Sequence, residues 1–217
     1  MNRTITAAIA AAIMTLVPNM ASAQMPPPMG VLEGNPKSDH RLTIISAFSC
    51  VYCRAFDTQA MEELRSVWIG KGLQVETIPV SISPTDIPAS IAATCGDPKK
   101  YARRSTILFR SQSAIAGNWR GADEETRRKV EAMPKGASAP EIAKLSGISD
   151  MASSLGLTNR QLSECIGDPV RQARQIKREK LTDEKWHIVG TPTVFLDGKK
   201  IGSTWEDVRK ALQKTYS

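Results

Sequence analysis

The first part of the chain alternates between strand-like and helix-like apolar patterns. Leu42 to Ala47 is a short, β-branched apolar run, which predicts a central strand covered on both faces. A helical pattern follows from about Cys50 to Ile69 and ends at Gly70-Lys71-Gly72. Its expected buried face carries Phe56, Ala60, Leu64 and Val67. Because Leu73 to Ile82 returns to a strand pattern, this part predicts a right-handed βαβ unit.

The pattern becomes helical between Thr85 and about Trp186. Thr158-Asn159-Arg160-Gln161 has the form of a capping box. Proline also stands where a helix can begin, in Asp86-Ile87-Pro88, Asp97-Pro98, Ala139-Pro140 and Asp168-Pro169. We therefore expect a helical insertion of about 100 residues.

Strand signals return after Gly190. Thr191 to Leu196 predicts a strand, Asp197-Gly198 a hairpin turn and Lys199 to Ile201 the partner strand. Trp205 to Tyr216 predicts a closing helix. The expected order is βαβ, helical insertion, ββα.

Residues 1–23 have the features of an export signal. Arg3 precedes the apolar stretch Ile5 to Val17, and Ala21-Ser22-Ala23 has the form of a cleavage site. A membrane anchor is the less favoured alternative, because a span needs roughly 20 apolar residues. We expect a periplasmic protein that starts near Gln24, in a compartment where disulfides persist. Residues 24–41 predict a mobile or extended arm.

The charge of the chain does not indicate nucleic acid as a partner. Loss of Arg3 with the signal lowers the formal net charge from +7 to +6. The basic runs are broken by Asp and Glu and have few interleaved aromatic residues, which is typical of solvated helical faces.

Cys50 and Cys53 are the residues with the clearest chemical potential. They stand where the first strand should pass into a helix, and the N-terminal turn of a helix stabilises a thiolate. The spacing alone allows a zinc site, a structural disulfide or a reversible dithiol. Zinc needs two more ligands, and the remaining Cys and His residues, Cys95, Cys165, His40 and His187, are far apart in the sequence. We expect no metal and no cofactor.

Pro192 begins an otherwise apolar strand. A proline at this position fits either a cis Thr191-Pro192 bond or the ordinary start of an edge strand. The spacing alone leaves both open.

Together these segments resemble the DsbA-type disulfide oxidoreductases of bacterial periplasms. The likeness rests on Phe48 to Cys53, the long helical insertion and Gly190 to Lys199, and it covers roughly residues 40–217. It implies an α/β thioredoxin fold, in which a central mixed sheet has flanking helices. The thioredoxin-like domain would comprise residues 42–84 and 187–217, with a helical domain inserted at 85–186. The resemblance also implies a cis Thr191-Pro192 bond.

The resemblance also implies a role for each residue of the motif. Cys50 would be the exposed cysteine of low pKa, Cys53 its buried partner, and Thr191-Pro192 the loop that holds the substrate backbone. Phe48, Val51 and Tyr52 are expected to form an apolar rim for unfolded substrates. The expected partners are cysteine-containing secreted proteins and a membrane redox protein.

Two positions depart from the family pattern. Val51-Tyr52 supplies no histidine beside the Cys50 sulfur. Ile44 stands six residues before Cys50, where many thioredoxin-like proteins carry a buried acid that accepts the proton of the second cysteine. We therefore expect a milder oxidant than the strongest members of the family.

Cys95 and Cys165 lie in similar contexts, each shortly before an Asp-Pro pair that starts a helix. In an oxidising compartment they are predicted to form a structural disulfide that closes a loop of about 70 residues. Two separate buried thiols are the alternative.

Three other functions stay open. Thr191 and Tyr52 resemble the isomerase branch, so an isomerase or reductase is the nearest alternative to an oxidase. That branch carries an N-terminal dimerisation domain, whereas only the 18 residues Gln24 to Arg41 precede the first predicted strand, so we expect a monomer. A non-redox binding or assembly factor and a metal carrier are less favoured.

Overall fold

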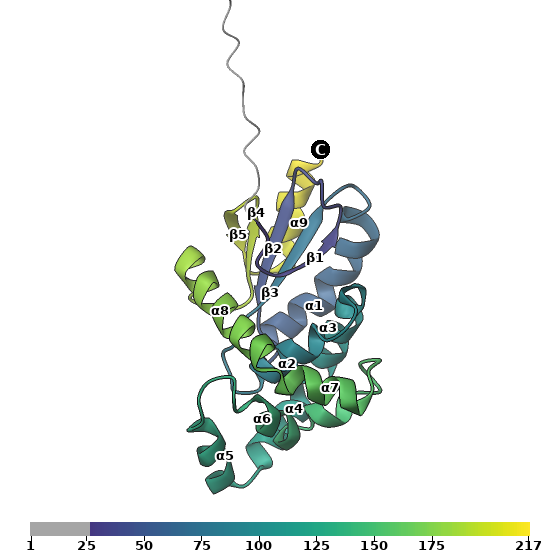
Figure 1. The fold of residues 1–217 in the computed structure, drawn as a ribbon. Helices are drawn as coiled ribbons and strands as arrows, with labels where there is room; N and C mark the ends of the chain where they lie inside the picture. Colours follow the sequence, from purple (N-terminus) through teal and green to yellow (C-terminus); the bar gives the residue numbers. More distant parts are fainter. Residues whose placement is uncertain (1–26) are drawn as a thin grey trace, which may run out of the picture.

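The structure is a computed structural model that describes residues 27–217. The predicted export signal lies outside these residues. The described chain forms a five-stranded sheet at one end and a group of helices at the other (Figure 1). The strands are β1 Val31–Gly34, β2 Arg41–Ser46, β3 Gln74–Pro79, β4 Thr193–Leu196 and β5 Lys199–Gly202.

The sheet has the order β1-β3-β2-β4-β5. β2 and β3 pair in parallel, and the other neighbours pair antiparallel. A parallel pair needs a crossover, which is supplied by α1 Val51–Glu63 and the π-helical turn η1 Leu64–Trp68. The predicted mixed α/β architecture is confirmed.

Alternating side chains of the central strands build two cores. Leu42 and Ile44 of β2 face α1 and the last helix, α9 Trp205–Thr215, with Phe56 and Trp205 in edge contact. Ile45 faces the opposite side, where Trp186 stacks against Phe195 at 5.3 Å between ring centroids. Both faces of β2 are therefore covered, which explains its continuous apolar sequence.

The helical pattern placed Val67 on the buried face, and this is wrong. In η1 the Ile69 N–H bonds to the Leu64 carbonyl at 2.9 Å, five residues back. The extra residue in this turn rotates the chain, so Trp68 is buried at 4% exposure and Val67 is 39% exposed.

The expected N-terminal arm contains a strand. β1 pairs with β3 as an edge strand, and the Gly30 N–H donates to the Glu76 carboxylate at 2.8 Å. Thr43 of β2 donates to the other oxygen of Glu76 at 3.2 Å. Pairing with β3 orders a segment that the sequence alone indicated only as extended or mobile.

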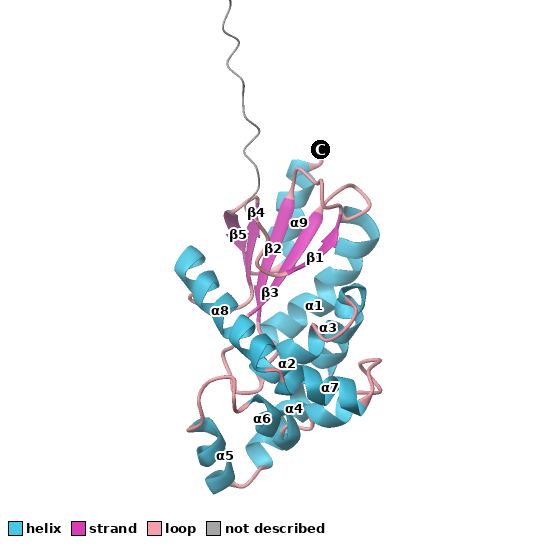
Figure 2. Cartoon of the chain, viewed as in Figure 1, coloured by secondary structure: helices cyan, strands magenta, loops and turns pink. Residues whose placement is uncertain are grey.

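Helices occupy the chain between β3 and β4 (Figures 1 and 2). Asp168 caps the long helix α8 by accepting from the Val170 N–H, and Thr158 and Gln161 form the expected capping box of α7. The elements are α2 Asp86–Ala93, η2 Pro98–Lys100, α3 Tyr101–Arg110, α4 Gln112–Gly121, α5 Glu124–Glu131, α6 Ala139–Leu145, η3 Ile148–Met151, α7 Asn159–Gly167 and α8 Pro169–Trp186.

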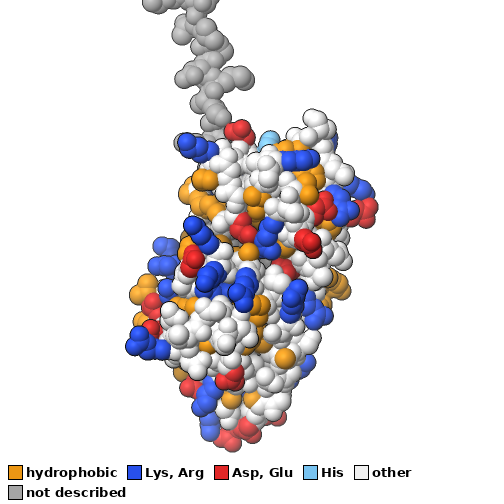
Figure 3. Space-filling model, turned by 90° about the vertical axis from the view of Figure 1, so that its right-hand side faces the viewer, with side chains coloured by type: hydrophobic (Ala, Val, Ile, Leu, Met, Phe, Trp, Pro, Cys, Tyr) orange, Lys and Arg blue, Asp and Glu red, His pale blue; other side chains and the backbone are white. Residues whose placement is uncertain are grey.

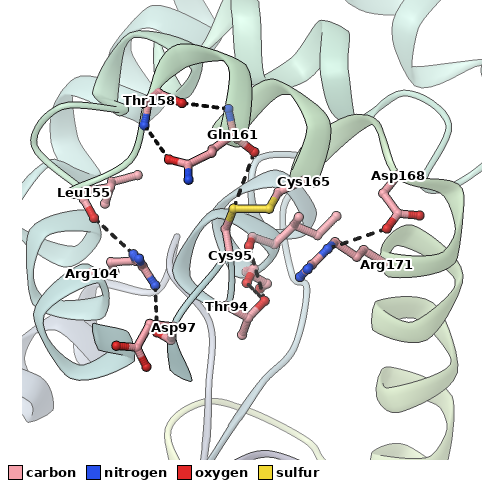
Figure 4. Close-up of a disulfide and its surroundings, with 12 residues drawn as sticks. Thr94, Cys95, Asp97, Arg104, Leu155, Thr158, Gln161, Cys165, Asp168 and Arg171 are labelled. Atoms are coloured by element: carbon pink, nitrogen blue, oxygen red, sulfur yellow. Dashed lines mark hydrogen bonds and ion pairs between the residues drawn. A yellow bond between two sulfur atoms is a disulfide. The ribbon is translucent and has the colours of Figure 1, made fainter. Parts of the chain in front are cut away.

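A disulfide joins Cys95, just after α2, to Cys165 in α7 (Figure 4). Next to it, the guanidinium of Arg104 is buried and donates to the backbone carbonyls of Leu155 at 3.0 Å and Asp97 at 3.1 Å. The bond and the buried arginine tie α2, α3 and α7 together.

The surface is mixed in charge. On the face shown in Figure 3, Lys and Arg side chains are interspersed with acidic and apolar ones. Within residues 27–217, no helix has the length and apolar character needed to cross a membrane.

Candidate active site around Cys50 and Cys53

Cys50 lies at the junction of β2 and α1, where it is the N-cap of the helix. Its sulfur accepts a hydrogen bond from the Cys53 backbone N–H at 3.2 Å. The first N–H groups of a helix have no partner within the helix, so they stabilise negative charge on this sulfur. Both cysteines carry free thiols in this structure.

These contacts lower the pKa of Cys50 to about 5. The hydrogen bond from the Cys53 thiol has the largest effect and lowers the pKa of Cys50. Burial has the second largest effect and raises it. The Thr191 hydroxyl and the backbone N–H groups of Cys53 and Tyr52 lower it further. Cys50 is therefore the more acidic thiol of the pair, which is the property expected of a nucleophile and leaving group.

Cys53 has the opposite environment. Burial, followed by its interaction with Cys50, raises the pKa of the Cys53 thiol far above its ordinary value. The side chain is 1% exposed, and its sulfur accepts from the Ala47 N–H at 3.5 Å. The two thiols are thus held in different protonation states.

The Thr191-Pro192 peptide bond is cis and lies beside Cys50. In the thiol form, Cys50 Sγ donates to the Thr191 carbonyl oxygen at 3.2 Å. Thr193 secures the loop by donating to the Gly190 carbonyl at 2.7 Å. Residues about 140 positions apart in the sequence therefore form one site.

The expected apolar rim is only partly present. Val51 and Tyr52 are 58% and 73% exposed beside Cys50. Phe48 is not a rim residue, because its ring packs against Phe109 at 4.9 Å between centroids and is buried. Cys50 was expected to be exposed but is only 6% exposed, because the Thr191 carbonyl lies against its sulfur.

Two hollows have the Thr191 loop in their linings. A groove of about 640 Å³ is lined by Tyr52, Gln59, Thr191 and Trp205 among others. A second hollow of about 430 Å³ is lined by Ile82, Val189 and Thr191 among others, and Ile82 and Val189 are exposed. An extended peptide crossing Thr191 would have room in either hollow.

Sequence reasoning missed Asp86. This fully buried carboxylate accepts hydrogen bonds from the N–H and hydroxyl of Ser49, both at 2.7 Å, and from the N–H groups of Ile82 and Ser83 at 2.9 and 2.8 Å. Burial raises its pKa, opposed by these hydrogen bonds. Asp86 therefore anchors the residue before Cys50, and its place in the first turn of a helix was the available sequence signal.

Gln112 was missed as well. Its side-chain Nε2 donates to the carbonyls of Phe48 at 2.6 Å and Cys50 at 2.9 Å, and the residue is buried. A glutamine in a helical insertion gives no signal for this role.

No cluster of three or more Cys, His, Asp or Glu side chains within residues 27–217 is arranged to hold an ion.

Comparisons with known proteins bear on the family and the fold of the chain. The family model described as Thioredoxin matches residues 27–214. A search of the curated proteins gives no match.

Solved structures share the fold at low sequence identity. A protein-disulfide isomerase from Novosphingobium aromaticivorans has a TM-score of 0.76 and 19% identity, over 86% of this chain and 96% of that chain. Wolbachia pipientis alpha-DsbA1 has a TM-score of 0.68 and 16% identity, over 88% and 93%. Chlamydia trachomatis DsbA has a TM-score of 0.58 and 16% identity, over 95% and 97%. The predicted DsbA-type fold, with its helical insertion, is confirmed.

Proposed function

We propose that the chain, which belongs to the thioredoxin family, is an exported thiol:disulfide oxidoreductase. It would oxidise thiols of other secreted proteins through a mixed disulfide at Cys50. The observation that carries the proposal is the position of Cys50 Sγ, 3.2 Å from both the Cys53 nitrogen and the Thr191 carbonyl oxygen.

The reaction starts from the Cys50-Cys53 disulfide. A substrate thiolate attacks Cys50 Sγ, the bond between the two enzyme sulfurs breaks, and Cys53 leaves with the electron pair. A second substrate thiolate then attacks the substrate sulfur of the mixed disulfide and expels Cys50 as a thiolate. The substrate gains one disulfide, and the enzyme is left as the dithiol found in this structure.

The Cys50 thiolate supports net oxidation. A stable leaving thiolate favours the reduced enzyme, which makes the enzyme a stronger oxidant. Its pKa of about 5 lies between the values of about 7 for thioredoxin and about 3.5 for DsbA. This intermediate value supports the hypothesis of a milder oxidant, which a measured potential near −120 mV would contradict.

The surface around Cys50 supports unfolded polypeptides as the substrate class. Val51, Tyr52 and Val189 expose apolar area around a largely buried sulfur. The cis loop offers the Thr191 backbone as an edge for an extended substrate chain. Phe48 takes no direct part in this surface, because it is buried.

The remaining parts of the proposal rest on the sequence as well. Residues 1–23 serve as a signal peptide that directs export, and the enzyme works in the periplasm. A membrane redox protein reoxidises its dithiol or, for the reverse flux, reduces its disulfide. The protein is a monomer and binds no nucleic acid. Cys95 and Cys165 serve as a structural disulfide.

An isomerase or reductase that uses the same site is the second candidate. It is favoured by the fold match to a protein described as a protein-disulfide isomerase. A redox titration of Cys50 and Cys53, paired with rates of oxidising a reduced peptide and of reshuffling a mispaired one, separates the two candidates.

Mixed-disulfide trapping tests the proposal itself. Cys53→Ala should accumulate covalent adducts with secreted proteins at Cys50, because the thiol that resolves them is missing. Cys50→Ala is the matched control and should accumulate none. Absence of adducts from Cys53→Ala in a periplasmic extract would favour a non-redox binding factor or a metal carrier.

A further inference from the structure

A small cavity of about 20 Å³ has Cys53 in its lining. One water molecule needs roughly 10 to 15 Å³ together with two or more polar partners. Ile44 contributes to the apolar part of the wall. The polar residues that line it are Ser46, Cys53, Asp57, Arg65, Thr77, Tyr101 and Ser105. The cavity is therefore large enough and polar enough for one bound water.

Tyr101 gives independent support for a water at this place. Its side chain is 2% exposed. The Ser105 side chain, which also lines the cavity, interacts with its hydroxyl but does not make a full hydrogen bond with it. A buried hydroxyl without a partner is costly, by about 1 to 3 kcal/mol. A water in the cavity that Tyr101 lines satisfies it.

Asp57 connects this cavity with the surface. It lies one helical turn after Cys53 on α1, so the two side chains are on the same face of the helix. Asp57 also lines an open groove of about 670 Å³, together with Arg54 and Glu62. Among the described residues, Asp57 is the acidic side chain common to the linings of the groove and the cavity.

The charged groups around Asp57 come from four elements, of which α1 itself contributes Arg54 and Glu62. Arg65 of η1 pairs with Glu33 of β1 at 2.8 Å, and Arg110 lies at the end of α3. Burial raises the pKa of Asp57 to about 6, opposed by Arg65, by a hydrogen bond to Thr106 and by Arg110, and assisted by Glu33. A carboxyl group with such a pKa can give and take a proton near neutral pH.

We infer that Asp57 is the proton donor and acceptor for Cys53, through one water held in the cavity between them. The inference rests on the proposed function, since it concerns the step in which Cys53 leaves or attacks. It also explains how the chain functions with Ile44 at the position where a buried acid was expected: the acid approaches Cys53 from the helix instead of from the strand.

The proton and the electrons balance at each step. When a substrate thiolate attacks Cys50, Cys53 leaves as a thiolate with the electron pair of the broken bond. Protonated Asp57 gives its proton to the water, which passes one of its own protons to the Cys53 sulfur. Asp57 becomes a carboxylate and regains a proton from solvent through the groove. In the reverse direction, the carboxylate takes the Cys53 proton as that sulfur attacks the mixed disulfide.

The test measures the rate at which a reduced cysteine-containing peptide reduces the Cys50-Cys53 disulfide, as a function of pH. Asp57→Asn keeps the shape but carries no transferable proton, and should slow the reaction by at least about tenfold. It should also abolish the inflection near pH 6. Asp57→Glu should restore both. Glu62→Gln, in the same groove but outside the cavity lining, is the control and should match the wild type.

A wild-type rate and inflection in Asp57→Asn would overturn the inference. If Asp57→Asn does not fold, the same rate is measured in Tyr101→Phe, which removes a partner of the water without changing a charge. A several-fold slower rate supports the inference, and an unchanged rate overturns it. The adducts of Cys53→Ala do not require Asp57, so their absence reports on the proposed function alone.

Discussion

The side-chain Nε2 of Gln112 donates a hydrogen bond of 2.9 Å to the backbone carbonyl of Cys50. Gln112 opens α4, far from Cys50 in the sequence, and the same nitrogen donates to the Phe48 carbonyl. The helical insertion therefore holds the backbone of the reactive cysteine directly. Cys50 and Cys53 also belong to the apolar core that the inserted helices share, rather than to the core beneath the sheet.

We predict that Gln112→Ala lowers the free energy of unfolding by about 1 to 3 kcal/mol. The Phe48 carbonyl loses the Gln112 donor, and the Cys50 carbonyl keeps only the Arg54 N–H. Urea unfolding of the reduced protein measures this change. Gln213→Ala, at an exposed position of α9, is the control and should change stability by no more than about 0.5 kcal/mol. Equal effects of the two substitutions would contradict the prediction.

Thr191→Val should raise the pKa of Cys50, because the hydroxyl that helps to stabilise the thiolate is lost. A hydrogen bond to a charged group contributes about 1.5 kcal/mol or more, so the rise should be about one unit. The enzyme should also become less oxidising. The ultraviolet absorbance of the thiolate against pH gives the pKa, and Thr58→Val on the exposed side of α1 should leave it unchanged.

The pH dependence of stability should report on Asp57. Burial raises its pKa from 3.8 to about 6 in the folded protein. The folded state thus holds this proton more tightly than the unfolded state, and the free energy of unfolding falls as the pH rises between these values.

Asp57→Asn should remove this fall, which amounts to at most about 3 kcal/mol. The variant should therefore be more stable than the wild type at pH 7. Denaturant unfolding at a series of pH values measures it, with Glu62→Gln as the exposed control on the same helix. If the free energy of unfolding of Asp57→Asn depends on pH as that of the wild type does, Asp57 is not the source of this fall.

Loss of the Cys95-Cys165 bond should destabilise the helical part without altering the thiols of the active site. The bond spans 70 residues of sequence, and closing such a loop contributes about 4 kcal/mol in the chain-entropy description. The double variant Cys95→Ala, Cys165→Ala should lose about this much in urea unfolding. The pKa of Cys50 should stay at about 5, and a shift of that pKa would show instead that the bond shapes the active site.

The sequence by itself determined the order of the elements and the place of the Cys50-Cys53 pair at the start of a helix. Period-two and helical patterns placed β2, α1, β3 and the closing ββα segment within a few residues of their observed positions. Local rules suffice for this, because strand and helix patterns and caps involve residues close in the chain. The Cys50 N-cap follows from the same local geometry.

Only the tertiary structure decided what surrounds the pair. The burial of Phe48 depends on contact with Phe109 of α3. Trp68 turns towards the core because of a π-helical turn that no residue type specifies. Gln112 and Asp86 reach the loop of Cys50 from helices far along the chain. The cavity of Asp57 likewise exists only where α1, α3 and the strands meet. Hydrogen bonds and burial between distant segments set these environments, and sequence periodicity carries no information about which distant side chains meet.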